Sequence, residues 1–183
     1  MTDLSDLREA ERPQAPKLPD VTERQRAQGR HLAAIHRLHL REIAQIRGLI
    51  ERIDADRAAA PDLAAAVSGL SMRRNLATFG ALCGRECHAL FFHHDAEEYQ
   101  LFPVVDRLPG FAPLVAKLRQ EHTVIHALID ALGAGAEALV ASPDDHSYAA
   151  LRDTFRRLAA ALASHFHYEE TELEEALGTL GIL

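Results

Sequence analysis

The chain has 183 residues, of which 27 are acidic and 20 are basic, and its formal net charge is −7. This length suits one domain with a sizeable core, and the scattered basic residues exclude a phosphate-binding stripe, so we expect no nucleic-acid partner. No apolar run approaches the ~20 residues of a membrane span, and the N-terminus lacks the features of a secretory segment. We therefore expect no membrane contact and a cytoplasmic location.

The first 20 residues differ in character from the rest of the chain. Pro13, Pro16 and Pro19 lie among charged residues, and no apolar period accompanies them. We therefore expect a mobile or extended arm over residues 1–20, followed by one helical domain over residues 21–183.

Apolar residues at helical spacing predict four long helices in that domain. Their predicted ranges are about 21–54, 71–108, 113–141 and 143–177. The signals that start or stop them are Asp20 with Glu23, Ser71, Leu108-Pro109-Gly110, Pro113, Ser142-Pro143 and Gly178. Strand-type alternation is absent, so the sequence predicts an all-α fold, an antiparallel up-down four-helix bundle with an N-terminal extension.

A His-x-x-x-Glu-Glu-x-x-Leu motif occurs twice, starting at His93 in the second predicted helix and at His165 in the fourth. Positions i and i+4 lie one turn apart on the same helix face, so the side chains of His93 and Glu97 point in the same direction. The same holds for His165 and Glu169. Burying a carboxylate without a partner is costly, and both Glu residues lie on predicted core faces. The two motifs therefore predict a metal centre inside the bundle.

The other two predicted helices also carry histidines on their apolar faces. His122 and His126 lie four residues apart on the third helix, and both could bind a metal. On the first helix, periodicity does not separate His36 from His39, but aligning this helix with the third superposes their apolar residues better for His36. The remaining histidines, His94 among them, are interpreted as solvated or rim residues.

Three further polar groups lie on the second predicted helix. Glu86 lies seven residues before His93 on the same face, where it either orients a ligand, lines a solvent route or reaches water near the middle of the helix. Cys83 and Cys87 are too few for a disulfide framework, and we interpret them as packing residues rather than redox groups.

These motifs resemble those of hemerythrin-like proteins, the group with a His-His-Glu cation-binding domain, and the similarity covers about residues 30–178. The residues that carry it are His93-x-x-x-Glu97-Glu98-x-x-Leu101-Phe102-Pro103, Glu121-His122 and His165-x-x-x-Glu169-Glu170. The resemblance implies two non-haem iron ions joined by an oxo or hydroxo bridge. The ligands that it implies are His36, His93, Glu97, His122, His126, His165 and Glu169. True hemerythrins carry the last acidic ligand one residue further along, so Glu170 remains an alternative.

The implied ligand set leaves one position open on a pair of six-coordinate irons. Dioxygen, peroxide or nitric oxide could bind there, so the resemblance implies a protein that binds or senses dioxygen or a related small oxidant. The alternatives are a di-iron oxidoreductase that acts on peroxide or nitric oxide, an iron–sulfur cluster repair factor, and a metal store or structural metal module. The residues do not decide whether the chain is an enzyme, and imidazole and carboxylate suit iron, manganese and zinc alike.

Overall fold

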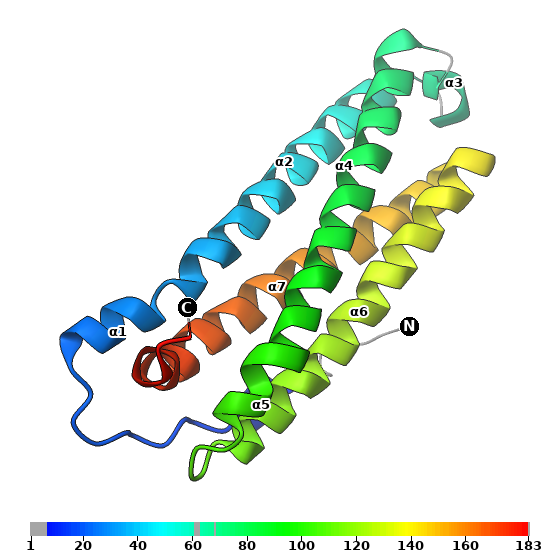
Figure 1. Ribbon diagram of the computed structural model, residues 1–183. Helices are drawn as coiled ribbons and strands as arrows, with labels where there is room; N and C mark the ends of the chain where they lie inside the picture. The colour runs from blue at the N-terminus through cyan, green and yellow to red at the C-terminus, as the bar shows by residue number, and fades with distance from the viewer. Residues whose placement is uncertain (1–6, 61–62, 68, 183) are drawn as a thin grey trace.

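The computed structural model describes residues 7–60, 63–67 and 69–182, which form helices and no strand (Figure 1). In chain order the elements are the 3-10 turn η2 (Glu9–Glu11), α1 (Glu23–Gly29), α2 (Leu32–Ala58), α3 (Leu63–Val67), α4 (Leu70–Ala96), the π-helical turn η3 (Glu97–Leu101), α5 (Phe102–Val105), α6 (Ala112–Ala141) and α7 (Asp145–Leu180). The predicted all-α fold is confirmed.

The four long helices α2, α4, α6 and α7 form the bundle (Figure 1). Helix α2 packs against α4, α4 against α6, α6 against α7, and α7 against α2, so the contacts close a ring around one core. Within the part of the chain that the structure describes, no helix combines the length and the apolar character that a membrane crossing requires.

The first predicted helix is divided into two, because the chain turns between α1 and α2 where one helix over 21–54 was expected. Helix α1 crosses the end of α7 so closely that a Cβ atom on Gly29 would overlap the backbone of Glu174. Its capping box joins Thr22 to Gln25 and not the predicted pair two residues earlier. The close crossing requires a residue without a side chain, and it covers the C-terminal turn of α7.

The second predicted helix is also modified near its end. Helix α4 continues into the π-helical turn η3, where the Phe102 N–H donates to the Glu97 carbonyl five residues earlier. Such turns widen a helix locally and change which residues share a face. The helical segment ends before Gly110, whose positive φ of 85° forms the predicted stop.

Two apolar clusters fill the bundle on either side of a layer of buried polar residues. On α2, Leu32 belongs to the smaller cluster and Ile43 to the larger one, with the buried His36 between them. The same order holds on the next helix, where Leu90 lies in the larger cluster and Leu101 in the smaller. The helices therefore place a polar layer inside an otherwise apolar core.

The described part of the N-terminal arm lies against α6 and α7 (Figure 1). Arg12 binds Glu121 of α6 through two hydrogen bonds, and the hydroxyl of Tyr168 on α7 donates to the carbonyl of Pro13 at 2.7 Å. The Arg12 guanidinium also stacks on the Tyr168 ring at 4.6 Å. The arm is therefore extended and attached to the same two helices that border the polar layer.

Candidate metal centre

Each long helix brings one of the predicted histidines into the polar layer. His36 comes from α2, His93 from α4, His122 from α6 and His165 from α7. The ring centroids of His122 and His165 are 4.9 Å apart, and those of His36 and His93 are 5.0 Å apart. The four helices therefore converge on one place, at a level that is nearer the α1 and α5 end of the bundle.

The side chains in this layer form two groups. Within each group, the potential ligand atoms all lie within 4.8 Å of one another. The members of the first group are His36, His93, Glu97 and Glu169, and those of the second group are His94, His122 and His165. Six of the seven residues predicted as metal ligands therefore lie together, and one residue that was not predicted has joined them.

Glu97 lies between the two groups. Its Oε1 atom is 3.3 Å from Nε2 of His93 and 3.9 Å from Nε2 of His36, whereas its Oε2 atom is 3.4 Å from Nε2 of His122. One carboxylate therefore presents one oxygen to each group, which is the geometry of a bridging ligand.

Glu169 occupies a similar position on the opposite helix. Its Oε2 atom lies 3.5 Å from Nε2 of His36 in the first group and 3.5 Å from Nε2 of His165 in the second. Two carboxylates, one from each motif, therefore lie between the two groups.

The donor atoms of this layer have no hydrogen-bond partner within the protein. Among the described residues, the buried side-chain nitrogen and oxygen atoms without a partner are the Nε2 atoms of His36, His93, His94, His122 and His165 and both carboxylate oxygens of Glu97 and Glu169. Each such atom costs about 1–3 kcal/mol when it is buried unpaired, and a charged group costs more. The unpaired atoms coincide with the two groups, so the residues fit the binding of metal cations.

The two carboxyl groups differ in acidity without a cation. Burial raises the pKa of Glu169 well above its ordinary value, and the neighbouring Glu97 carboxylate adds to this effect. Burial would also raise the pKa of Glu97, but the imidazoles of His122 and His36 outweigh it and hold that pKa well below its usual range. The protein alone therefore favours one ionised carboxylate, and a dication would allow both to ionise.

Burial keeps most of these imidazoles neutral. It lowers the pKa of His93 to about 3, despite the opposing effect of Glu97. It also lowers the pKa of His94 and His165, and the positive charge that His122 can carry acts in the same direction. A neutral imidazole is the form that binds a metal ion.

Three carboxylates outside the cluster fix the orientation of its imidazoles. The Nδ1 atom of His36 lies 2.9 Å from a carboxylate oxygen of Glu170. The same atom of His122 lies 2.9 Å from Glu98, and that of His165 lies 3.1 Å from Glu121. Because an ionised carboxylate only accepts, each Nδ1–H donates and each Nε2 lone pair points into the cluster. Glu170, the sequence alternative to Glu169, therefore orients a histidine and does not face the cluster.

His94 and His126 have places that the sequence did not predict. The interpretation of His94 as a solvated or rim residue was wrong, because the side chain is 0% exposed and belongs to the second group. His126, predicted as a ligand, is half-buried and lies outside both groups, with its Nε2 atom 2.9 Å from Nδ1 of His94. The structure therefore places His126 where it orients His94.

A signal for His94 was present in the sequence. His94 and Glu98 are also four residues apart, so two overlapping His-x-x-x-Glu pairs extend from α4 into η3, about 100° apart around the helix. The His93 ring contacts His36 of α2 and Phe166 of α7, whereas the His94 ring stacks on His122 and His126 of α6. A helix that borders two neighbours can supply ligands from both faces.

Periodicity alone left open whether His36 or His39 is the ligand on the first predicted helix. Its Nδ1 atom lies 2.6 Å from Oε1 of Glu86, and both side chains are buried beside the cluster. The His39 ring lies 5.0 Å from the His93 ring without joining either group. The structure therefore places His36 in the cluster, and it pairs Glu86 with His39.

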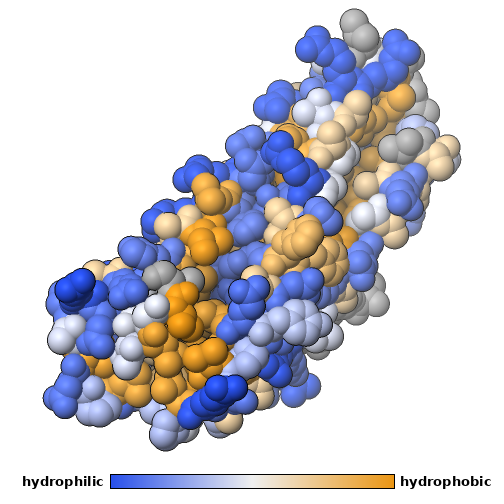
Figure 2. All heavy atoms as spheres, viewed as in Figure 1, coloured by the Kyte–Doolittle hydropathy of each residue, from blue (hydrophilic) through white to orange (hydrophobic). Residues whose placement is uncertain are grey.

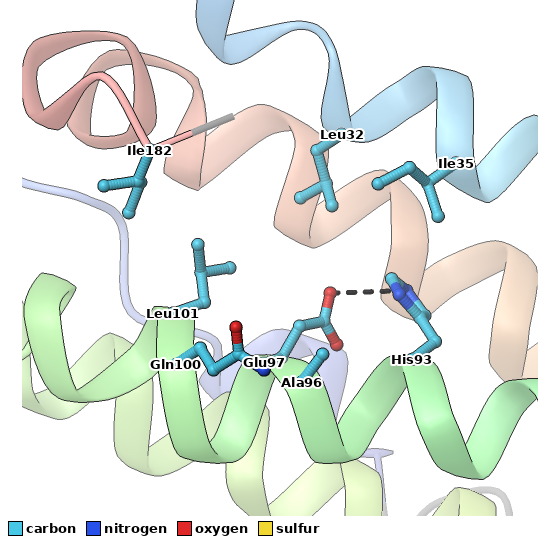
Figure 3. Close-up of a pocket in the computed structure, with 8 residues that line it drawn as sticks. All are labelled: Leu32, Ile35, His93, Ala96, Glu97, Gln100, Leu101 and Ile182. Atoms are coloured by element: carbon cyan, nitrogen blue, oxygen red, sulfur yellow. Dashed lines mark ion pairs between the residues drawn. The ribbon is translucent and has the colours of Figure 1, made fainter.

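A pocket of about 350 Å³ leads from the surface to the first group (Figure 3). His93 and Glu97 line its inner part, where the close-up shows the carboxylate of Glu97 directed toward the imidazole of His93. The other lining residues are Leu32, Ile35, Ala96, Gln100, Leu101 and Ile182. Figure 2 shows hydrophobic side chains gathered at this end of the molecule, on a face that is otherwise mostly hydrophilic. The candidate centre is therefore reached through an apolar opening.

Comparison with known proteins agrees with this geometry. The sequence model of the family described as Hemerythrin HHE cation binding domain matches residues 27–177. The search of curated proteins found no match, and neither did the search of solved structures. The matched segment covers most of the chain and includes every member of the two groups. The chain belongs to the hemerythrin HHE cation-binding domain family, and its clusters of His and Glu can bind metal.

Proposed function

We propose that this domain holds two iron ions and binds or senses dioxygen, or a related small oxidant such as peroxide or nitric oxide. The observation that carries the proposal is the set of unpaired Nε2 and carboxylate atoms, which form two groups joined by Glu97 and Glu169. A single cation would leave the imidazoles of the other group buried without a partner. Two cations use all of these atoms.

The composition of the ligand set supports a binding role. Five imidazoles and two carboxylates make this site richer in nitrogen than the carboxylate-rich centres of ferritin-like enzymes, which use Glu from two helices and Glu-x-x-His from two others. When bound, the iron ions supply an open coordination position and a change between the ferrous and ferric states. Fewer carboxylates stabilise high-valent iron less, so reversible binding is favoured over oxygen activation.

The protein's own contribution is to hold the ligands and to exclude water. Glu98, Glu121 and Glu170 fix three imidazoles in the tautomer that presents Nε2 to the cations. The two apolar clusters cover the layer on both sides, and the neutral state of His93 is secured by burial.

Reconstitution tests the proposal directly. Ferrous iron is added to the metal-free protein without oxygen, the bound iron is measured per chain, and the visible spectrum is then recorded before and after exposure to air. Two irons per chain and an intense new visible band that decays on degassing would support reversible binding. One iron per chain, or uptake of zinc with no uptake of iron, would contradict the proposal.

A di-iron oxidoreductase that acts on peroxide is the second candidate. The pocket favours it for an organic peroxide, because a cavity of about 350 Å³ that ends at His93 and Glu97 is larger than either dioxygen or hydrogen peroxide needs. Multiple turnover of peroxide by the iron-loaded protein, measured with a chemical reductant present, would favour this candidate. A single stoichiometric reaction with oxygen would favour the binding role.

A further inference from the structure

The pocket beside the first group has a polar end and an apolar end. Its inner end holds His93 and Glu97, whose Nε2 and carboxylate atoms are buried without hydrogen-bond partners. The walls toward the surface are formed by Leu32, Ile35 and Leu101. Figure 3 shows the two aliphatic side chains of α2 on one side of the opening and Leu101 on the other. Such a cavity matches a molecule with one polar end and a hydrocarbon body.

The size of the pocket indicates a ligand larger than a diatomic gas. A water molecule occupies roughly 30 Å³ of liquid, so a cavity of about 350 Å³ exceeds the need of dioxygen or hydrogen peroxide several times over. Pockets for small organic ligands begin at about 300 Å³. The cavity is therefore at the lower end of the range for organic molecules.

The charge of the lining restricts the class of ligand further. Among the residues that the structure describes, no lysine or arginine lines the pocket, and the Glu97 carboxylate lies at its inner end. The walls therefore offer an organic anion no basic side chain for an ion pair, whereas an uncharged O–H group could donate to a carboxylate oxygen at the inner end. Gln100 adds a neutral amide to the lining. The lining therefore favours a neutral molecule.

The outer wall depends on the last turn of the chain. Helix α7 ends at Leu180, and Gly181 adopts a positive φ of 65° that turns the chain after the helix. Ile182 follows this turn and faces Leu101 across the opening (Figure 3). Ile182 is 37% exposed, so it forms the rim of the pocket and does not seal it.

We propose that this pocket binds a small, uncharged organic molecule with one hydroxyl or hydroperoxyl end, the class that includes organic hydroperoxides and their alcohols. The O–H end lies toward His93 and Glu97, and the hydrocarbon part lies along Leu32, Ile35 and Leu101. The inference rests on the proposed function in one respect, because an organic oxidant in this pocket would be the partner of the metal centre. Binding itself needs only the pocket.

The test measures binding without redox chemistry. The full chain is loaded with zinc, which cannot change its oxidation state, and titrated with 2-phenyl-2-propanol, an alcohol with the shape of an organic hydroperoxide. Isothermal calorimetry should show saturable binding at one site per chain. The hydrocarbon 2-phenylpropane, which has the same shape without the hydroxyl, should bind at least about tenfold more weakly because it lacks the O–H group of the polar end.

The variant Ala96→Leu assigns the binding to this pocket. Ala96 lines the cavity at the end of α4, and three added carbon atoms would occupy the space of the ligand, so affinity should fall by about tenfold or more. Ala81→Leu is the matched control, because Ala81 is also an exposed alanine of α4 but does not line this pocket. Zinc content and melting temperature should be the same in both variants, which shows that each is folded and loaded.

The outcomes separate this inference from the proposed function. Absence of saturable binding to the wild-type chain, or equal loss in Ala96→Leu and Ala81→Leu, would overturn the pocket inference. Binding to the zinc form, together with a failure of the iron form to respond to air, would overturn the proposed function and leave the pocket inference standing. A response of the iron form to air without alcohol binding would overturn the pocket inference and leave the proposed function standing.

Discussion

Arg12 and Glu121 form an ion pair with two hydrogen bonds, in which Nε of Arg12 lies 2.8 Å from Oε1 of Glu121 and Nη2 lies 3.0 Å from Oε2. The Glu121 carboxylate is fully buried and accepts a third bond from Nδ1 of His165 at 3.1 Å. Burial would raise the pKa of Glu121, but His165 and Arg12 outweigh it and lower that pKa. The N-terminal arm therefore helps to keep this carboxylate ionised and aligned with a candidate metal ligand.

Replacing Arg12 with Gln should weaken metal binding by up to roughly tenfold, because losing a direct partner of a ligand costs about 10–100-fold and Arg12 acts through such a partner, Glu121. A competition titration with a coloured chelator measures this change. Arg8→Gln is the matched control, since Arg8 also lies in the arm but forms only an exposed ion pair with Glu11. Equal affinity in the two variants would show that the arm does not support the centre.

The places of His94 and His126 give a second prediction. His94→Ala removes a buried member of the second group, so the protein should retain about half of its metal or less. His126→Ala removes only the partner of His94 Nδ1, so the metal count should persist with lower affinity. Elemental analysis of the purified variants distinguishes the two. His88→Ala, on an exposed histidine, is the control that should change nothing. Metal loss in His126→Ala equal to that in His94→Ala would contradict this placement.

The helices and the central motif could be predicted because both depend on local spacing. A helical period of 3.6 residues places His93 beside Glu97 and His165 beside Glu169 whatever the neighbours are. The order of helix caps and helix-breaking residues along the chain was sufficient to predict four long helices. The fold class and the convergence of these pairs from two helices therefore follow from the sequence.

The remaining features depend on how the helices pack. Whether His94 or His126 reaches the second group is decided by the rotation of α4 against α6, which the periodicity of either helix alone does not fix. The break after Gly29 requires the nearby backbone of α7, which sequence periodicity does not reveal. The contact of Arg12 with Glu121 joins residues that are 109 positions apart. None of these relationships leaves a periodic signal in one chain.

Removal of the metal should lower stability. The unpaired atoms of the cluster carry a cost that bound cations remove, and a ligand at one hundred times its Kd stabilises the folded state by about 2.7 kcal/mol. For a chain of this size the melting temperature should therefore fall by roughly 5–10 °C after chelation. Differential scanning calorimetry before and after chelation, with metal added back as the control, checks the effect. An unchanged melting temperature would show that the core does not depend on a cation.

Acid should destabilise the metal-free protein. Burial lowers the pKa of His93 from its ordinary 6.5 to about 3, so the unfolded chain takes up a proton between these values that the folded chain does not. This stability is fully present above pH 6.5 and is lost as pH falls toward 3. Between pH 7 and 5 the loss from His93 alone is about 2 kcal/mol.

Other buried groups in the same layer oppose or reinforce this trend. His94 and His165 also have lowered pKa values and act in the same direction, whereas the raised pKa of Glu169 acts against them. Urea unfolding of the metal-free protein at pH 7 and at pH 5 measures the sum. His93→Gln should show a smaller difference between the two pH values than the wild-type chain. A wild-type chain as stable at pH 5 as at pH 7 would contradict the prediction.

The two thiols should differ in reactivity. Sγ of Cys83 lies 3.8 Å from Sγ of Cys87, and this hydrogen bond raises the pKa of the Cys83 thiol and lowers that of Cys87. Cys83 is buried, whereas Cys87 is half-buried along a groove that Gly84 and Gly133 leave open. Since the thiolate is the reactive form, iodoacetamide at pH 7 should modify Cys87 first, as peptide mass spectrometry can show.

The shared hydrogen bond supplies the check on this assignment. Cys83→Ala removes the donor that stabilises the Cys87 thiolate, so the alkylation rate of Cys87 should fall although its access improves. In Cys87→Ala the remaining Cys83 should stay almost unreactive in the folded protein and react freely in urea, because burial limits its access. Faster alkylation of Cys87 in the Cys83→Ala variant would show that access, and not the shared proton, controls the reactivity of this thiol.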